Sequence, residues 1–509
     1  MTAAARATTG ASAEIDHEVV IIGSGFSGLG CAVALQQAGF DDFVLLERES
    51  ELGGTWVQHD YPGLEVDMPF FIYSFPFEVK PDWKHVYPSG AEMREYTQHC
   101  AHKYDLVRRT HCNAAVERAE YDESANVWRI QARDGRRWVA RYLVNATGLL
   151  VTPKQPDIPG LDDFAGKRIH SADWDYDYDL RGKRIAVIGT GATAIQIVPA
   201  ICEQVEHLDV YQRTPIWLLP KPNPELAGGF QRALEVVPGL QTLMRWAASL
   251  FVELSMGLGM VRYTRFPWIF DWLEKTMVSN IREQISDPAM QEALIPEYSF
   301  FCKRPSFSDT FYPALERDDV ELITSPIERV TRHGIRTADG RERPVNALIC
   351  ATGYEVFNRR CMPGYELIGR DGVDLGAFWE ENGYQAFEGA TVPGFPNLFF
   401  FMGPYSAAGA SYFTMIDTQG KHLTRCLEEA RRRGANYIEV DRTAHERDFA
   451  KVRKRRGTTV LFGGNCAPSR SYYFDQRGDA PGMRPVTGFE HWLNSRFFRL
   501  ANYHFDRRG

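Results

Sequence analysis

Two glycine-rich turns have the residue types and spacing that bind the phosphates of a dinucleotide. Glycine at the first two positions of such a turn allows a tight bend and a close approach of the backbone to a pyrophosphate, and a small third residue lets a helix pack on a strand. The free N–H groups of that helix then favour the anion. The predicted binding residues of the first turn are Gly23, Gly25, Phe26, Ser27 and Gly28, and those of the second are Gly189, Thr190, Gly191, Ala192, Thr193 and Ala194.

The charge that follows each turn predicts which dinucleotide it binds. Glu47 lies 24 positions after Gly23, and Arg213 lies 24 positions after Gly189. A carboxylate accepts hydrogen bonds from a ribose diol but repels a 2′-phosphate, whereas a guanidinium pairs with one. The first site is therefore predicted to bind FAD and the second NADPH, with Thr214 and Lys303 as further phosphate contacts.

The elements around each turn support a Rossmann-like arrangement. A β-branched strand precedes each turn ("HEVVII", "KRIAVI"), and an Ala/Leu- or Ile-rich helix follows it, which is the context that makes the glycine pattern informative. Two further apolar strands, 143–148 and 348–354, end in Ala-Thr-Gly and are expected where the chain crosses between the domains. The predicted fold class is α/β, with two Rossmann-like dinucleotide-binding domains.

Composition excludes several other classes of protein. The chain has 509 residues and a net charge of −8, so it lacks the basic surface of a nucleic-acid-binding protein. Its nine cysteines are scattered without a CxxC pair, which favours reduced thiols in a cytoplasmic protein. No His, Cys or carboxylate spacing indicates a metal. Residues 1–16 are expected to form a flexible leader and not a signal peptide. The apolar stretch 246–261 is interrupted by Glu253 and too short to span a bilayer, so we expect a core or surface helix there, with contact to a membrane surface as the alternative.

The segment "FAGKRIHSADWD" between the two turns carries Phe164, Gly166, His170 and Trp174 at fixed offsets. It resembles the fingerprint of the type I Baeyer–Villiger monooxygenases, which use FAD, NADPH and O2 and are related to the flavin-containing monooxygenases. In that family the fingerprint joins the two nucleotide domains. For His170 the resemblance implies a hinge hydrogen bond that responds to bound NADP, and an ordinary interface histidine is the alternative.

The resemblance extends to about residue 480. "GGTW", with Gly54, Thr55 and Trp56, and "YPG" followed by Asp67 resemble the loop at the flavin ring, and "CKRP" resembles the segment that brings Lys303 and Arg304 to the cofactors. "PNLFFFMGP", 396–404, is similar to the strand that returns to the flavin. Two positions differ: Glu65 stands where the family often has Arg, and Val460 stands where a late loop commonly has Trp.

The resemblance implies a monooxygenase that inserts one oxygen atom of O2 beside a ketone carbonyl through a flavin C4a-peroxide, giving an ester or lactone. Arg304 would supply a fixed positive charge and Asp67 would orient it. Two alternatives stay open: an N- or S-oxygenating flavin-containing monooxygenase, and a non-oxygenating flavoprotein that oxidises NADPH or senses redox state.

Hydrophobic patterning and the resemblance together divide the chain. Residues 222–300 lack strand alternation and carry Trp, Leu, Met and Phe at helical spacing, which predicts helices with a core-packing stripe. In the resembled family an all-helical insertion sits here within the NADPH domain. The expected division is 1–150 and 349–509 for the FAD domain, 151–221 and 301–348 for the NADPH domain, and 222–300 for the insertion.

Overall fold

The larger of two Rossmann-like sheets contains the first glycine turn. The structure, a computed structural model, describes residues 14–408 and 411–508; residues 1–13 of the expected leader lie outside this range. The large sheet has the strand order β19-β4-β5-β6-β1-β2-β3, with β20 also pairing with β6. Its strands are β1 (His17–Ile22), β2 (Phe43–Leu46), β3 (Thr110–His111), β4 (Val116–Asp122), β5 (Val127–Ala132), β6 (Arg137–Asn145), β19 (Glu366–Ile368) and β20 (Leu398–Phe400).

Strand β1 has apolar side chains on both faces because both faces of the large sheet are covered. Val19 and Ile21 belong to one buried cluster, and Val20 and Ile22 belong to the opposite one. A parallel strand covered on both sides reads as a continuous apolar run, and β1 pairs in parallel with both β2 and β6. The helices of this domain include α1 (Phe26–Gln37), α3 (Gly90–Lys103), α11 (Leu375–Asn382), α12 (Tyr412–Arg433), α13 (Arg442–Arg456) and α15 (Gly488–Phe497).

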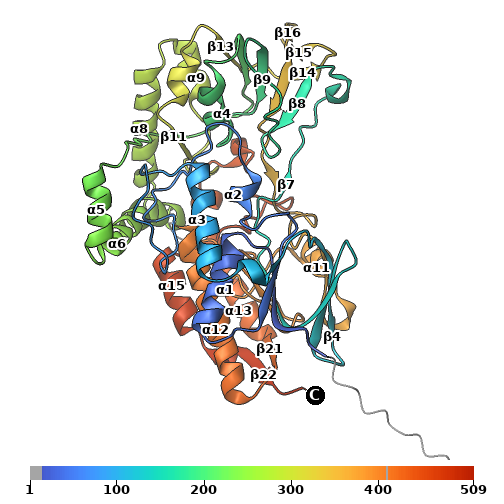
Figure 1. The fold of residues 1–509 in the computed structure, drawn as a ribbon. Coiled ribbons are helices and arrows are strands. Elements are labelled where there is room, and N and C mark those ends of the chain that lie inside the picture. The colour runs from blue at the N-terminus through green and yellow to red at the C-terminus, as the bar shows by residue number, and fades with distance from the viewer. Residues whose placement is uncertain (1–13, 409–410, 509) are drawn as a thin grey trace, which may run out of the picture.

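The smaller sheet contains the second glycine turn and lies above the large-sheet domain in Figure 1. Its five strands pair in parallel in the order β13-β10-β9-β17-β8. They are β8 (Lys167–His170), β9 (Arg184–Ile188), β10 (His207–Tyr211), β13 (Val320–Ile323) and β17 (Ala347–Cys350), with α4 (Ala194–Ile201), α10 (Phe311–Leu315) and a three-stranded sheet of β14 (Ile327–Val330), β15 (Gly334–Thr337) and β16 (Glu342–Pro344). The predicted pair of Rossmann-like domains is confirmed.

An all-helical segment is inserted between two short strands of the small-sheet domain, β11 (Leu218–Leu219) and β12 (Ser306–Phe307), which pair in parallel. Its helices are α5 (Gly228–Val236), α6 (Leu240–Val252), the π-helical turn η3 (Glu253–Gly257), α7 (Leu258–Val261), α8 (Trp268–Gln284) and α9 (Pro288–Leu294). The predicted core stripe is present in α8, where Phe270, Met277 and Ile281 are buried.

For helix α6 the predicted core stripe is wrong. The apolar side chains of this helix and of η3 are exposed by 57–70%: Leu243, Trp246, Leu250, Phe251 and Leu254. On the inner face, Leu240 and Met244 pack against the core beside polar side chains. Arg245 donates to the Ser74 hydroxyl at 2.9 Å, and the Glu253 carboxylate accepts from the Gly488 N–H at 2.8 Å. Residues 246–254 therefore form a surface segment with exposed apolar side chains, whereas Met260 and Val261 at the end of the predicted stretch are buried. Within the described residues, no helix is both long and apolar enough to cross a membrane.

The chain passes between the two domains at two adjacent short strands. Strand β7 (Thr152–Pro153) follows β6 of the large sheet, and β18 (Tyr354–Glu355) follows β17 of the small sheet. The two strands pair antiparallel, with Tyr354 opposite Pro153, and β7 lies between the two sheets in Figure 1. Both expected crossing points, after the Ala-Thr-Gly sequences, are thus side by side.

Candidate functional site

The first glycine turn is shaped by direct backbone contacts. Gly23 has φ +101°, and a Cβ atom there would lie 2.5 Å from the Ala146 carbonyl oxygen. A Cβ atom on Gly28 would lie 2.0 Å from the Gly23 carbonyl oxygen, so the helix cannot pack this close to the turn with any larger residue. Glu47 is buried, and one carboxylate oxygen accepts hydrogen bonds from the Ser24 N–H at 3.0 Å and hydroxyl at 2.6 Å. The carboxylate therefore lies directly beside the turn.

The side chains that follow this turn belong to the protein core. Phe26 is 4% exposed and packs 4.7 Å from the ring of Phe413, and the Ser27 hydroxyl lies 2.7 Å from that of Tyr412. These contacts leave the backbone N–H groups of Phe26 and Ser27, at the start of α1, as the groups that can face an anion. The N-cap residue Gly25 offers no side chain to compete for them.

The predicted flavin-ring loop meets the first turn. Gly54 has φ +59°, and a Cβ atom there would lie 2.8 Å from the Gly25 Cα atom. Helix α2 (Thr55–Gln58) begins immediately after Gly54, with Thr55 exposed and Trp56 buried edge-on to Tyr73. The loop and the glycine turn are therefore adjacent, as the sequence predicts.

The second glycine turn repeats this geometry at the end of β9. Gly189 has φ +114°, and its Cβ position lies 2.6 Å from the Ala351 carbonyl oxygen. No heavy atom of the described chain lies within 4 Å of the Cβ position of Gly191, so this face of the turn is open to a ligand. The Thr190 hydroxyl donates to the Thr214 carbonyl at 3.3 Å. The rest of the turn comprises exposed Ala192, half-buried Thr193 and buried Ala194, the first residue of α4.

Three cations gather near the second turn without a carboxylate partner among the described residues: Arg213, Lys303 and Arg470. Burial and the nearby charge of Arg213 lower the pKa of Lys303 to about 8. Burial and the charge of Arg470 lower the pKa of Arg213 as well. Mutually repelling cations beside a glycine turn are suited to bind a multiply charged anion. Arg213 and Lys303 were predicted from the sequence, but Arg470 was not.

Arg304 and Asp67 form a two-pronged ion pair between the domains. Arg304 Nη2 lies 2.8 Å from Asp67 Oδ1 and 2.6 Å from Oδ2, and Nε lies 3.0 Å from Oδ2. The Asp67 charge raises the pKa of the Arg304 guanidinium, which stays charged at any pH of interest. The Arg304 side chain is still 47% exposed, so part of the guanidinium faces open space. The structure brings together the two residues predicted to be catalytic.

The fingerprint segment is the edge strand of the small sheet. Strand β8 pairs with β17, and the flanking aromatic residues Phe164 and Trp174 are buried in different clusters of this domain. A Cβ atom on Gly166 would lie 2.5 Å from both the Asn346 carbonyl oxygen and the Phe164 ring. Phe164, Gly166 and Trp174 therefore pack around a strand of the small sheet. The fingerprint segment is part of this domain and does not serve only as a linker.

His170, the last residue of β8, contacts the crossing between the domains. Its Nδ1 accepts from the Ala172 N–H at 3.1 Å, so Nε2 carries the proton and faces the Lys154 carbonyl at 3.4 Å. The Thr352 hydroxyl lies 3.5 Å from the same Nε2 atom. Burial lowers the pKa of His170. Lys154 follows β7 and Thr352 precedes β18, so this imidazole contacts both connections.

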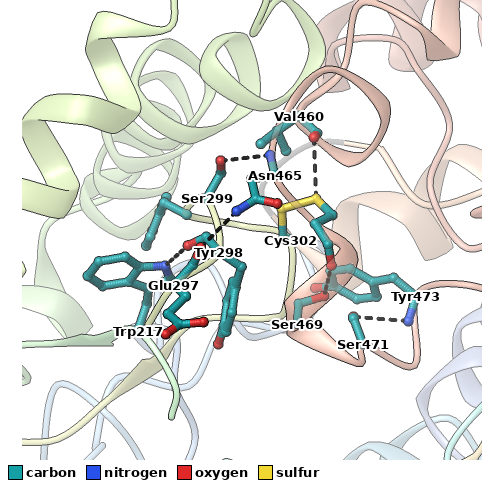
Figure 2. The surroundings of a disulfide bond; sticks show 12 residues. Trp217, Glu297, Tyr298, Ser299, Cys302, Val460, Asn465, Ser469, Ser471 and Tyr473 are labelled. Atoms are coloured by element: carbon teal, nitrogen blue, oxygen red, sulfur yellow. Dashed lines mark hydrogen bonds between the residues drawn. A yellow bond between two sulfur atoms is a disulfide. The ribbon is translucent and has the colours of Figure 1, made fainter. Parts of the chain in front are cut away.

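The late loop is attached to the segment that precedes Lys303 (Figure 2). A disulfide joins Cys302 to Cys466, and the Asn465 side chain donates to the Glu297 carbonyl at 2.9 Å. The prediction that all cysteines are reduced is therefore wrong for this pair. Their separation of 164 residues leaves no local sequence signal.

The packing of Val460 accounts for the absence of the Trp that the family commonly has at this position. It begins α14 (Val460–Gly463), is fully buried, and packs in the same apolar cluster as Met260 and Phe300. A side chain in this position serves the contact with the helical insertion and does not face the nucleotide turn.

One group of potential metal ligands occurs among the described residues, away from both turns. Ligand atoms of His207, Asp209 and Glu321 lie within 4.8 Å of one another. Arg343, however, contacts both Glu321 oxygens, at 2.7 and 3.3 Å. The guanidinium already supplies a positive charge to Glu321, and His207 Nε2 lies 3.2 Å from Asp209 Oδ1, so we interpret the arrangement as an ion-pair cluster.

The chain is similar in sequence to a family of redox proteins and to two monooxygenases. The family model described as pyridine nucleotide-disulphide oxidoreductase matches residues 20–235, which include both glycine turns. A Baeyer–Villiger monooxygenase from Pseudomonas aeruginosa is 38% identical over 472 residues, covering 92% of this chain and 86% of the relative. A Baeyer–Villiger monooxygenase from Streptomyces coelicolor is 36% identical, covering 95% and 92%.

Solved structures show the same arrangement over the full length. Cyclohexanone monooxygenase from Rhodococcus sp. Phi1, bound to NADP+, superimposes with a TM-score of 0.84 at 25% identity, covering 97% of this chain and 99% of that one. An oxidised steroid monooxygenase bound to NADP gives a TM-score of 0.83 at 25% identity, covering 97% and 100%.

Proposed function

Because the chain belongs to the Baeyer–Villiger monooxygenase family, we propose that it inserts one oxygen atom of O2 beside the carbonyl group of a small-molecule ketone, using FAD and NADPH. The product is an ester or a lactone. The observation that carries the proposal is the Arg304–Asp67 pair, a fixed and partly exposed positive charge held between two dinucleotide turns.

The large-sheet domain is proposed to hold FAD. The groups present fit it: uncapped N–H groups at the start of α1, glycines where any Cβ would collide, and Glu47 beside the turn for a ribose. The loop of Gly54, Thr55 and Trp56 would face the flavin ring. When bound, the flavin supplies the redox chemistry, accepting hydride from NADPH and activating O2.

The small-sheet domain is proposed to hold NADPH. The open face of Gly191 suits the pyrophosphate, and Arg213, Lys303 and Arg470 suit the 2′-phosphate that distinguishes NADPH from NADH. Thr214 lies beside Thr190 of the turn and would contact the same phosphate. This domain is proposed to comprise residues 151–221 and 301–348, with the insertion 222–300 and the late loop enclosing the ketone.

Arg304 is proposed to stabilise the negative charge that develops on the substrate oxygen during insertion, and Asp67 to orient the guanidinium. A preorganised charge in a site that excludes water stabilises a transition state more than the same charge in water would. His170, hydrogen-bonded at both connections, is proposed to sense how the domains are placed relative to each other. A cytoplasmic location is proposed because NADPH is supplied there; the buried disulfide is sheltered from cytoplasmic reductants.

The proposal is tested by measuring NADPH consumption with and without a panel of linear, cyclic and aromatic ketones, amines and sulfides under 18O2. Mass spectrometry should find ester or lactone that carries one labelled oxygen. Labelled N-oxide or sulfoxide alone would identify an N- or S-oxygenating enzyme. NADPH oxidation that yields only H2O2 would identify a flavoprotein that does not oxygenate.

A further inference from the structure

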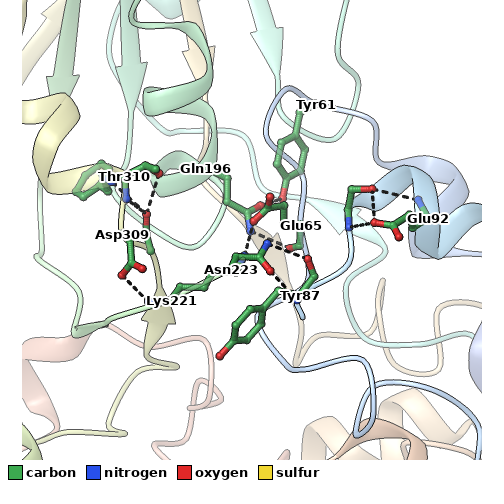
Figure 3. Close-up of polar contacts among 12 residues, drawn as sticks. Tyr61, Glu65, Tyr87, Glu92, Gln196, Lys221, Asn223, Asp309 and Thr310 are labelled. Carbon is green, nitrogen blue, oxygen red and sulfur yellow. Dashed lines mark hydrogen bonds and ion pairs between the residues drawn. The ribbon is translucent and has the colours of Figure 1, made fainter. Parts of the chain in front are cut away.

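Glu65, where the family often has a basic residue, has a specific partner in this chain. The Lys221 ammonium donates to Glu65 Oε2 at 2.6 Å, as Figure 3 shows. The Lys221 side chain is only 6% exposed, whereas that of Glu65 is 40% exposed. A buried ammonium is costly unless a carboxylate compensates it, so the pair is a specific feature of the fold.

The pair connects the same two segments as Arg304 and Asp67. Glu65 lies two residues before Asp67 on the loop of the large-sheet domain. Lys221 follows β11, and Arg304 precedes β12, the strand that pairs with β11. We call the paired strands β11 and β12 the ribbon. One three-residue segment of the loop, Glu65 to Asp67, therefore contacts both ends of the ribbon, each through its own ion pair.

The backbone of Glu65 is fixed as well. Gln196 of α4 donates to the Glu65 carbonyl at 2.9 Å and accepts from the Tyr61 hydroxyl at 2.9 Å. Gly63 of this loop packs against the same helix, since a Cβ atom there would lie 2.5 Å from the Gln196 carbonyl oxygen. The segment before Asp67 is thus attached to the small-sheet domain through main chain and side chain.

We propose that Glu65 and Lys221 are positioning residues that hold Asp67 against Arg304 independently of the Arg304–Asp67 contact. The inference rests on the proposed function, in which Arg304 turns part of its hydrogen bonding toward the substrate. The loop then needs a second attachment that takes no part in the chemistry. Glu65–Lys221 provides it at the neighbouring position, which is why an acid at residue 65 is compatible with activity here.

The test compares Glu65→Gln, Lys221→Met and the reversed pair Glu65→Lys/Lys221→Glu in the FAD-loaded enzyme. Both single variants should slow anaerobic flavin reduction at saturating NADPH by about tenfold, because the loop is then less firmly attached to the small-sheet domain, and small misplacements of reacting groups cost this much or more. They should also lower the product formed per NADPH. The Kd for NADPH should stay within about twofold, because its phosphate contacts are untouched. The reversed pair should regain most of both activities.

Arg343→Gln is the matched control. It breaks the Arg343–Glu321 pair, which has similar exposure, 12% and 43%, but lies on another part of the small-sheet domain. It should lower thermal stability and leave reduction rate and coupling unchanged. Flavin content and circular dichroism identify variants that do not fold. If Lys221→Met does not fold, the comparison of Glu65→Gln with the reversed pair tests the proposal.

Wild-type rates in a folded single variant, or a folded reversed pair as slow as the singles, would overturn the proposal. A wild-type enzyme that oxygenates nothing would refute the proposed function instead. The anaerobic reduction rate still reports on the pair in that case, because it requires no substrate oxygenation.

Discussion

The Arg304 guanidinium and the Asp67 carboxylate, 237 residues apart in the chain, lie in bidentate contact, with Nη2 2.6 Å from Oδ2. The contact joins the loop of the large-sheet domain to the strand ribbon of the small-sheet domain. The positive charge of the candidate site is thus correctly placed only when both domains are correctly placed.

Replacement of Arg304 by Ala should separate the two half-reactions. Reduction of the flavin by NADPH should persist, because hydride transfer does not require this guanidinium and the Glu65–Lys221 pair still attaches the loop to the small-sheet domain. Oxygenation should fall by about 10²–10³-fold, since a preorganised charge of this kind contributes about 3–4 kcal/mol. Arg304→Lys should restore little, because a compact ammonium cannot form the planar two-pronged contact. Rapid-mixing spectroscopy measures both steps, and ester formation at the wild-type rate by Arg304→Ala would contradict the assignment.

Replacement of Arg213 by Ala should change the choice of coenzyme. The KM for NADPH should rise about tenfold or more, the usual effect of losing one charge-assisted contact to a phosphate. The KM for NADH, which lacks the 2′-phosphate, should change little. Arg470→Ala should give a smaller effect in the same direction. Steady-state kinetics with both coenzymes decides, and equal losses with NADPH and NADH would assign these arginines a different role.

The affinity for NADPH should depend on pH through Lys303. Its pKa of about 8 means that the ammonium is present below pH 8 and is lost as the pH rises through 8. The KM for NADPH should therefore increase above pH 8, while that for NADH stays flat. In Arg213→Ala the neighbouring charge is gone, so the pKa of Lys303 should rise and the break should move to higher pH. A profile for Arg213→Ala identical to wild type would show that another group titrates.

The disulfide predicts a specific thiol count. The protein has nine cysteines, of which seven are free, so denaturation without reductant should release seven reactive thiols and reduction should release nine. Cys466→Ser should lower the free energy of unfolding by about 2–5 kcal/mol, the typical contribution of a native disulfide. Cys112→Ser, which removes a half-buried free thiol, is the control and should be nearly neutral. Nine thiols before reduction would show that the bond does not form.

The parts of the site that could be predicted from sequence depend on local geometry. Gly23, Gly28 and Gly189 sit where any Cβ atom would collide with a backbone carbonyl, so the glycine pattern records backbone shape directly. The charges at Glu47 and Arg213 follow from their distance along a strand–turn–helix unit. Arg304 and Asp67 were identified through the family resemblance, and the structure shows why they occur together.

The parts that could not be predicted depend on pairings distant in sequence. Arg470, Lys221 and the Cys302–Cys466 bond each depend on how the late loop, the ribbon and the insertion pack, and no spacing encodes this. The outward apolar side of α6 was missed for a related reason. Periodicity shows that a helix has two faces, but the partners of Arg245 and Glu253 decide which face is inward.

The antiparallel pairing of β7 with β18 also sets the mechanics of the molecule. Two chain connections that are hydrogen-bonded side by side resist sliding and separation. Bending of the two short strands β7 and β18 meets less resistance. We therefore expect any relative motion of the two domains to be a rotation about an axis through residues 152–153 and 354–355. His170, which contacts both connections, lies beside this axis.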